Sequence, residues 1–117
     1  MNKDELKQET KHYALRIIKL VESLPKGRTA EVLSRQLLRS GRSVGANYRA
    51  ACRAKSPADF ISKMGKVEEA DESMYRMELL IEVGLVSQDK IADLLDEANQ
   101  IVDIIVSSIR TTKRNKL

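Results

Sequence analysis

The 117-residue chain has the length of one compact domain, which we expect to span residues 1–117 with a single core. Hydrophobic residues make up 42% of it and aromatic residues only 3%, so the core must consist mainly of aliphatic side chains. A single cysteine excludes an internal disulfide and a multi-cysteine zinc site. The net charge of +4 allows an acidic partner without requiring one. Because no apolar run reaches the length of a membrane span or resembles a signal peptide, we expect a cytoplasmic protein with no membrane partner.

Apolar residues recur at the helical period in four segments, which Pro, Gly and Ser residues separate. The predicted helices span about 4–24, 29–54, 57–83 and 88–111, and the polar tail that follows is expected to fray. Because such short connections force neighbouring helices to run antiparallel, the sequence predicts an all-α, up-down-up-down four-helix bundle.

Local signals mark the ends of the predicted helices. Pro25 and Gly27 stop the first helix, and Thr29 is the expected N-cap of the second. The Ser-Pro-Ala-Asp segment that begins at Ser56 combines a capping residue, a proline at the first helical position and an early acid. Gly84 is the expected C-terminal cap of the third helix.

The segment from Arg28 to Lys55 separates into two faces at the helical period. Its apolar face contains Gly41 and Gly45, each of which costs a helix about 1 kcal/mol relative to alanine. A close approach by a neighbouring helix explains both glycines, and a flexible hinge is the alternative. The opposite face forms an arginine ridge that consists of Arg35, Arg39, Arg42, Arg49 and Arg53.

An acidic flank on the third predicted helix faces this ridge. If the second and third helices form a tight hairpin at Lys55 and Ser56, the numbers of facing residues sum to about 111–113. The expected pairs are Arg35 with Glu78, Arg42 with Asp71, and Ala46 with a site near Glu68. Exposed ion pairs contribute at most about 1 kcal/mol each, so they favour the register more than the stability.

Basic residues from all four helices collect at the hairpin end of such a bundle, because the first helix begins and the fourth helix ends there. We call this end the basic pole and define it by Arg49, Arg53, Lys55, Lys63, Lys66, Arg110, Lys113 and Arg114. Nearby charges come from Lys3, Lys7, Lys11 and Lys116, and from acids that include Asp59.

The basic pole supports two interpretations. The first is a site that contacts the phosphate backbone of RNA or DNA in a sequence-independent, salt-sensitive mode, or that contacts a nucleic-acid-handling protein. The second is a solvated end of a structural or protein-interaction oligomer with no nucleic-acid role. Because no aromatic residue is interleaved with these basic residues, the sequence argues against the stacking of bases on side chains.

The sequence lacks the patterns of a catalytic or metal site. Glu68, Glu69 and Glu72 suggest half of a di-iron centre, but the only histidine is His12 and no Glu-x-x-His motif exists. Cys52 lies on an apolar helix face, which favours inert packing over nucleophilic catalysis. We therefore expect no metal, no cofactor, no small-molecule substrate and no enzymatic activity.

The fourth predicted helix has apolar residues along more than one line. The second line would be exposed in a monomer, and it consists of Leu94, Ile101 and Ile104. An apolar patch of this kind usually marks an interface, so these residues are predicted to form the contact of a homo-oligomer. Wide burial within one bundle is the alternative.

Residues 20–86 resemble a bacterial family, the proteins encoded in intervening sequences of 23S ribosomal RNA genes. The matching motifs are LPKGRTAEVLSRQLLRSGRSVGANYRAACRA, SPADFISKMGKVEEADES and YRMELL, and Arg76 stands where the family pattern usually has an aromatic residue. The accessory variability determinant of diversity-generating retroelements is similar in kind.

The resemblance implies a four-helix bundle, commonly assembled as a homopentamer, without known catalytic activity. For most members of the family the role is unassigned, whereas the retroelement relative is a basic ring that works with a reverse transcriptase and binds nucleic acid. The resemblance assigns helix-packing and hydrogen-bonding roles to Arg39, Ser43, Gly45, Ala46 and Asn47.

Overall fold

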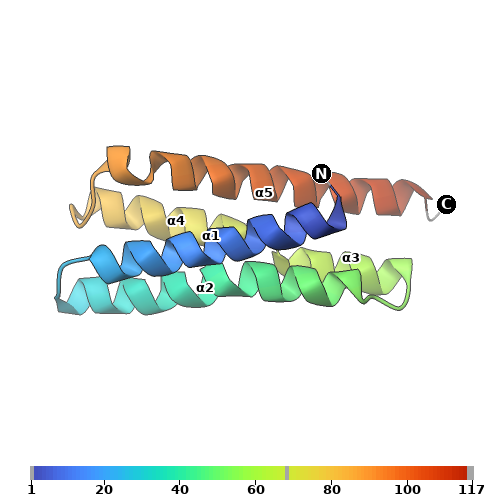
Figure 1. Cartoon of the computed structure of the whole chain (residues 1–117), viewed down its shortest axis with the longest axis horizontal. Helices are drawn as coiled ribbons and strands as arrows, with labels where there is room; N and C mark the ends of the chain where they lie inside the picture. The colour runs from blue at the N-terminus through green and yellow to red at the C-terminus, as the bar shows by residue number, and fades with distance from the viewer. Residues whose placement is uncertain (1, 68, 116–117) are drawn as a thin grey trace.

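The computed structural model describes residues 2–67 and 69–115, within which the chain forms helices and turns and no strand. The helices are α1 (Lys3–Ser23), α2 (Arg28–Cys52), α3 (Pro57–Val67), α4 (Glu69–Glu82) and α5 (Gln88–Asn115). They form an antiparallel bundle of 50 × 21 × 21 Å, in which α3 and α4 follow one another along the third helical position (Figure 1). The predicted all-α four-helix bundle is confirmed. No helix in the described part of the chain is long and apolar enough to cross a membrane.

The helix ends agree with the predicted ones to within two residues, with two exceptions. The segment predicted as one helix over 57–83 is described as α3 and α4, and residue 68 between them lies outside the described residues. Of the tail predicted to fray, residues 111–115 are helical instead, because α5 continues to Asn115, and residues 116–117 lie outside the described part of the chain.

Capping interactions account for most of these ends. Asn2 caps α1 by accepting a hydrogen bond from the backbone N–H of Glu5 at 2.8 Å, and the Ser56 hydroxyl accepts one from the N–H of Asp59 at 3.0 Å. The prediction that Thr29 caps α2 is wrong, since α2 begins at Arg28 and its N-cap is Gly27, which has no side chain to bond.

Gly84 ends α4 as the sequence predicts. Its φ of +82° lies in the left-handed region that glycine adopts without strain. The N–H of Gly84 donates to the carbonyl of Ile81 and the N–H of Leu85 donates to that of Leu80, both at 3.0 Å. This pair of bonds is the Schellman motif, which satisfies two carbonyls at the end of the helix.

The core is mainly aliphatic, with Tyr13 and Tyr48 as its buried aromatic residues. Leu94 is 3% exposed and Ile101 is fully buried, and the half-buried Ile104 packs against the same core. The expectation that these three residues form an exposed face of a monomer is therefore wrong. The apolar face of α5 is wide because α5 packs against α3, α4 and α1, so both of its apolar lines find partners inside the bundle.

The two glycines of α2 lie where α1 crosses closely. A Cβ atom at Gly41 would stand 3.0 Å from two side-chain carbons of Ile17, and one at Gly45 would stand 3.4 Å from the hydroxyl of Thr10. The first distance is tighter than ordinary van der Waals contact. The glycines thus allow the two helix backbones to approach, as the small-residue face predicts.

Facing residues of α2 and α4 have numbers that sum to 111–113, as the predicted hairpin requires. The buried hydroxyl of Ser73 donates to that of Ser40 at 3.1 Å, and the guanidinium of Arg39 lies 3.9 Å from the carboxylate of Glu72. The individual ion pairs differ from the expected ones. Arg35 pairs with Glu31 of its own helix at 3.3 Å, and among the described residues no carboxylate lies within 4 Å of Arg42. The predicted neighbourhood of Ala46 and Glu68 lies partly outside the described residues.

Candidate nucleic-acid interface

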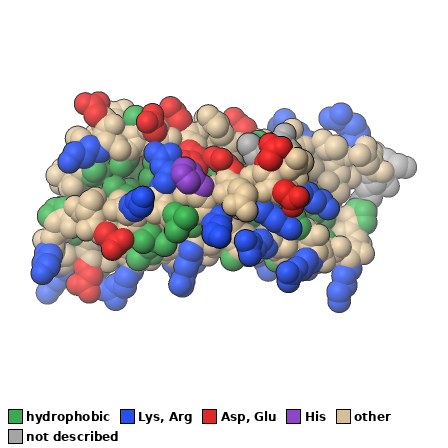
Figure 2. All heavy atoms as spheres, in the orientation of Figure 1, with side chains coloured by type: hydrophobic (Ala, Val, Ile, Leu, Met, Phe, Trp, Pro, Cys, Tyr) green, Lys and Arg blue, Asp and Glu red, His purple; other side chains and the backbone are tan. Residues whose placement is uncertain are grey.

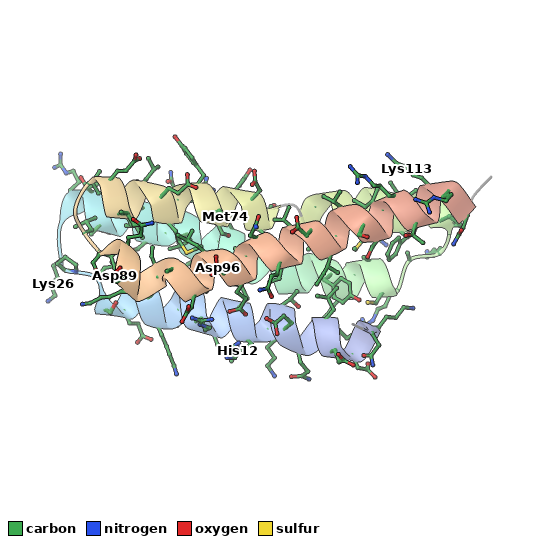
Figure 3. All side chains as sticks on the ribbon, turned by 90° about the horizontal axis from the view of Figure 1, so that it is seen from above. His12, Lys26, Met74, Asp89, Asp96 and Lys113 are labelled. Carbon is green, nitrogen blue, oxygen red and sulfur yellow. The ribbon has the colours of Figure 1, made fainter. Side chains whose placement is uncertain are left out.

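The end of α2, the start of α3 and the end of α5 lie together at one extremity of the bundle (Figure 1). Arg53 follows α2 there, and Lys113 is in the last turn of α5, at the end opposite to Lys26 and Asp89 (Figure 3). The antiparallel topology therefore brings the basic pole together from segments that are far apart in the sequence. Seven of its eight side chains are exposed, namely those of Arg49, Arg53, Lys55, Lys66, Arg110, Lys113 and Arg114.

Lys63 is the one side chain of the basic pole that is not exposed, and it forms an ion pair with a carboxylate. The Nζ of Lys63 donates a 3.0 Å hydrogen bond to Asp59, one turn earlier on α3, and is half-buried. The same oxygen of Asp59 accepts the backbone N–H of Lys55 at 3.0 Å. The hydrogen bond from Lys55, followed by that from Lys63, holds the pKa of Asp59 below its usual range. Asp59 thus joins the start of α3 to the preceding turn and neutralises one charge of the basic pole.

The remaining charges are distributed unevenly over the surface. In Figure 2, Lys and Arg side chains line the edge formed by α2, while a row of Asp and Glu side chains lies along the opposite edge, over α5. The acids of α5 all precede its last three turns, and Arg110, Lys113 and Arg114 follow them. Cations at the C-terminus of a helix also complement the helix dipole.

The lysines near the start of α1 contribute unequally. Lys3 is exposed and lines a cavity shared with α5, Lys7 is half-buried, and Lys11 is exposed farther along the helix. Lys116 lies outside the described residues. Lys3 is thus the α1 residue that the structure places against the basic pole.

An aromatic residue lies among these cations, because Phe60 stands between Lys55 and Lys63 in the sequence. Phe60 lines a cavity of about 430 Å³ together with Lys3, and an adjoining cavity of about 330 Å³ together with Lys3 and Lys55. Phe60 is half-buried. The expectation that no aromatic residue is interleaved with the basic residues is therefore wrong. Phe60 is separated from Lys3 by more than fifty positions in the sequence, so its proximity to Lys3, unlike that to Lys55, appears only in the folded chain.

A second polar cluster, between α1 and α5, was not predicted. Glu97 is only 7% exposed, and its carboxylate accepts a hydrogen bond from Arg16 and lies 3.4 Å from Nδ1 of His12. Partial burial, followed by the nearby carboxylate of Glu97, raises the pKa of Glu9 above its usual value. A signal was available in the sequence, because Glu97 interrupts the apolar line between Leu94 and Ile101.

The remaining candidates show ordinary surroundings. Cys52 is half-buried at the end of α2. Tyr13 was not a candidate, and burial raises the pKa of its hydroxyl above the normal range. Within residues 2–67 and 69–115, no three His, Cys, Asp or Glu side chains are grouped as a metal site would require. Arg76 is largely covered and pairs with Glu72 at 3.2 Å, so a charged side chain fills the position where the family pattern has an aromatic one.

Comparisons with known proteins identify a structural relative and a family for this chain. A crystal structure described as a protein of unknown function from the S23 ribosomal protein family of Bacteroides thetaiotaomicron superimposes with a TM-score of 0.86. The two sequences are 34% identical, and the match covers 94% of this chain and 99% of that one. A search among curated proteins found no match. The family model of the 23S rRNA-intervening sequence protein matches residues 2–107, and the chain therefore belongs to this family.

Proposed function

We propose that this protein is a non-enzymatic, nucleic-acid-binding bundle that contacts the phosphate backbone of RNA or DNA through its basic pole. The observation that carries the proposal is the convergence of exposed cations from α2, α3 and α5 at one end of the molecule. In the described part of the chain, only Lys63 of the eight defining residues forms an ion pair. Cations that no carboxylate neutralises are free to replace the counterions of a phosphate backbone.

Such contacts predict a strong dependence on salt. Each phosphate that a cation neutralises contributes about −0.9 to the slope of log K against log salt for duplex DNA, and about −0.7 for single strands. A pole that engages about four phosphates would therefore show a slope near −3. Fluorescence anisotropy with labelled RNA and DNA at several salt concentrations measures this slope.

Matched charge variants test whether the basic pole is the site. The pole variant carries Arg53→Gln, Lys113→Gln and Arg114→Gln. The control variant carries Lys26→Gln, Arg28→Gln and Lys90→Gln, which removes the same charge from exposed positions at the opposite end.

We expect the pole variant to bind at least tenfold more weakly at low salt and to show a shallower slope. The control variant should stay within about twofold of the parent protein, because its lost charges lie more than a Debye length of about 10 Å from the site. Equal losses in both variants would point to non-specific attraction by net charge. Absence of binding at low salt would refute the proposal outright.

We also propose that the protein assembles as a homo-oligomer, for which the family resemblance favours a pentamer. Exposed apolar side chains on α1 support assembly, since Leu15 is 49% and Ile18 is 40% exposed. Hydrophobic side chains are visible at the surface over α1 in Figure 2. A structural or protein-interaction oligomer without a nucleic-acid role remains the competing function, and the salt titration separates the two.

A further inference from the structure

We propose that the cavity beside Phe60 binds one unstacked base of a single-stranded nucleic acid. This inference rests on the proposed function and specifies its ligand. Cations around the cavity would hold the backbone, while the base would leave the strand and enter the apolar space. The experiment below distinguishes a failure of this inference from a failure of phosphate binding.

The cavity lies where four helices meet at the basic pole. Its volume of about 430 Å³ falls within the range of roughly 300–1,000 Å³ that is typical of sites for small organic ligands. The apolar part of its lining comes from α1, α2, α3 and α5, and consists of Leu6, Tyr48, Phe60, Met64 and Ile104. Because Leu6, Tyr48 and Met64 are buried, the cavity has an apolar floor beneath the half-buried Phe60 and Ile104.

The chemistry of the lining suits a nucleotide better than a purely apolar ligand. Lys3 is part of the lining, and Lys55 lines the adjoining cavity that shares Phe60 and Lys3 with it. A base offers an aromatic face to Phe60, and the phosphates on either side of it offer negative charge to the two lysines. An aliphatic ligand would leave these cations without a counterpart.

Hydroxyl groups on α5 add polar contacts at the rim. Ser108 donates to the carbonyl of Ile104 at 2.8 Å and Thr112 donates to that of Ser108 at 2.9 Å, which engages these two donors within the helix. Ser107 and Thr111 also line the cavity, are exposed and lie one helical turn apart. A hydroxyl both donates and accepts, so such a rim accommodates the edge of any base without a strong sequence preference.

Single strands are favoured over duplexes for a geometric reason. The bases of a duplex are stacked and paired, and extracting one costs a few kcal/mol before it can enter a pocket. The bases of a single strand already expose their faces. Aromatic stacking in single-strand binding proteins is accordingly tolerant of sequence.

The single phenylalanine of the chain provides a specific probe. Full-length protein that carries 4-fluorophenylalanine has one ¹⁹F signal, at Phe60. We expect a short single-stranded oligonucleotide to shift this signal at low salt, and a blunt duplex of the same charge to leave it nearly unchanged. If both ligands bind but neither shifts the signal, the base cavity is excluded while phosphate binding stands.

Substitutions complete the test. Phe60→Leu keeps an apolar side chain and removes the aromatic face, and Tyr75→Leu makes the comparable change at an exposed position on α4. Phe60→Leu should weaken single-strand binding by about fivefold or more, the lower end of measured stacking effects, and should leave duplex binding unchanged. Tyr75→Leu should change neither affinity.

The outcomes separate the two proposals. If Phe60→Leu loses single-strand and duplex affinity equally, or loses neither, the proposal that the cavity binds a base is overturned. This holds even if the pole variant fails to bind, which would support phosphate binding alone. No binding of any nucleic acid to the parent protein would overturn both proposals together. Thermal unfolding of Phe60→Leu confirms that any loss of affinity occurs in a folded protein.

Discussion

At the scale of single residues, Asp59 connects the stability of α3 to the charge of the basic pole. Its carboxylate accepts hydrogen bonds from the backbone of Lys55 and from the ammonium group of Lys63. The first bond closes the turn before α3, and the second withdraws a cation from the surface. One side chain therefore favours the fold while it reduces the positive charge available to a polyanion.

Asp59→Asn should accordingly raise nucleic-acid affinity and lower stability. Removing the carboxylate frees Lys63, which we expect to strengthen binding at low salt by about two- to fivefold, the scale of one exposed charge interaction. A neutral amide oxygen accepts weaker hydrogen bonds than a carboxylate, so the midpoint of thermal unfolding should fall at pH 7. Weaker binding by this variant would mean that Lys63 reaches the ligand only when Asp59 positions it.

The pH dependence of the same variant gives an independent check. Because the pKa of Asp59 is lower in the folded protein than its ordinary value of 3.8, its contribution to stability is present above that value. The contribution is lost as the pH falls through the folded-state pKa. The difference in unfolding midpoint between the parent protein and Asp59→Asn should therefore shrink below pH 3.8. Circular dichroism melts at neutral and acidic pH measure it.

At the scale of helices, the crossing of α1 over α2 depends on the absence of a side chain at Gly41. A methyl group there would meet Ile17 at 3.0 Å, a contact that overpacks the interface. Gly65 offers a matched comparison within α3, since nothing lies within 4 Å of the position that its Cβ would occupy. Both residues are helical, so alanine gains the same helix propensity at each.

We expect Gly41→Ala and Gly65→Ala to have opposite effects. Gly65→Ala should stabilise the protein by about 0.5–1 kcal/mol through helix propensity alone. In Gly41→Ala, overpacking costs about 1–3 kcal/mol and exceeds that gain, so the net effect should be destabilising. Urea unfolding of both variants provides the comparison. Stabilisation by Gly41→Ala would show that Ile17 adjusts its position at little cost.

Most of the helical architecture could be predicted because it depends on local signals and on periodicity. The caps at Ser56 and Gly84 and the seam at Gly41 follow from residue type alone. The N-terminus of α2 could not be placed at Arg28, because its N-cap is a glycine and makes no side-chain bond. The buried positions of Leu94 and Ile101 also required the structure, since periodicity reveals that a face is apolar but not which neighbours cover it.

The candidate site was predictable in part for the same reason. The antiparallel direction of the helices is enough to predict that Arg53 and Lys113 lie at the same end of the bundle. This prediction requires no knowledge of individual side-chain contacts. The cavity beside Phe60 depends instead on how side chains from four helices meet, which no local pattern specifies. Glu97 lies between these cases, since an acid on an apolar line was visible in the sequence but its partners on α1 were not.

At the scale of the whole molecule, the acids and the bases of α5 lie toward different ends of the bundle. The acids of α5 lie toward one end and the basic pole lies at the other, over a length of 50 Å. A polyanion attracts such a molecule with its basic pole forward. If several copies assemble in parallel, their basic poles would form one continuous surface and bind with higher apparent affinity than a single copy.

Assembly can be tested at the exposed apolar face of α1. Leu15 and Ile18 are three residues apart and so share one face of the helix, and an exposed apolar face of this kind often marks an interface. We expect the double variant Leu15→Lys and Ile18→Lys to lower the mass measured by light scattering toward the 13.2 kDa of one chain. Val83→Lys, at another exposed apolar position, is the control and should leave the mass unchanged.

The same variants connect assembly to binding. If parallel assembly multiplies the basic poles, the double variant should lose affinity for long single strands but retain it for oligonucleotides that span one pole. The Val83→Lys control should bind both as the parent protein does. A parent protein that is already monomeric at micromolar concentration would contradict the assembly proposal. Phosphate binding would then be the property of a single bundle, and the length of the strand would no longer affect affinity through avidity.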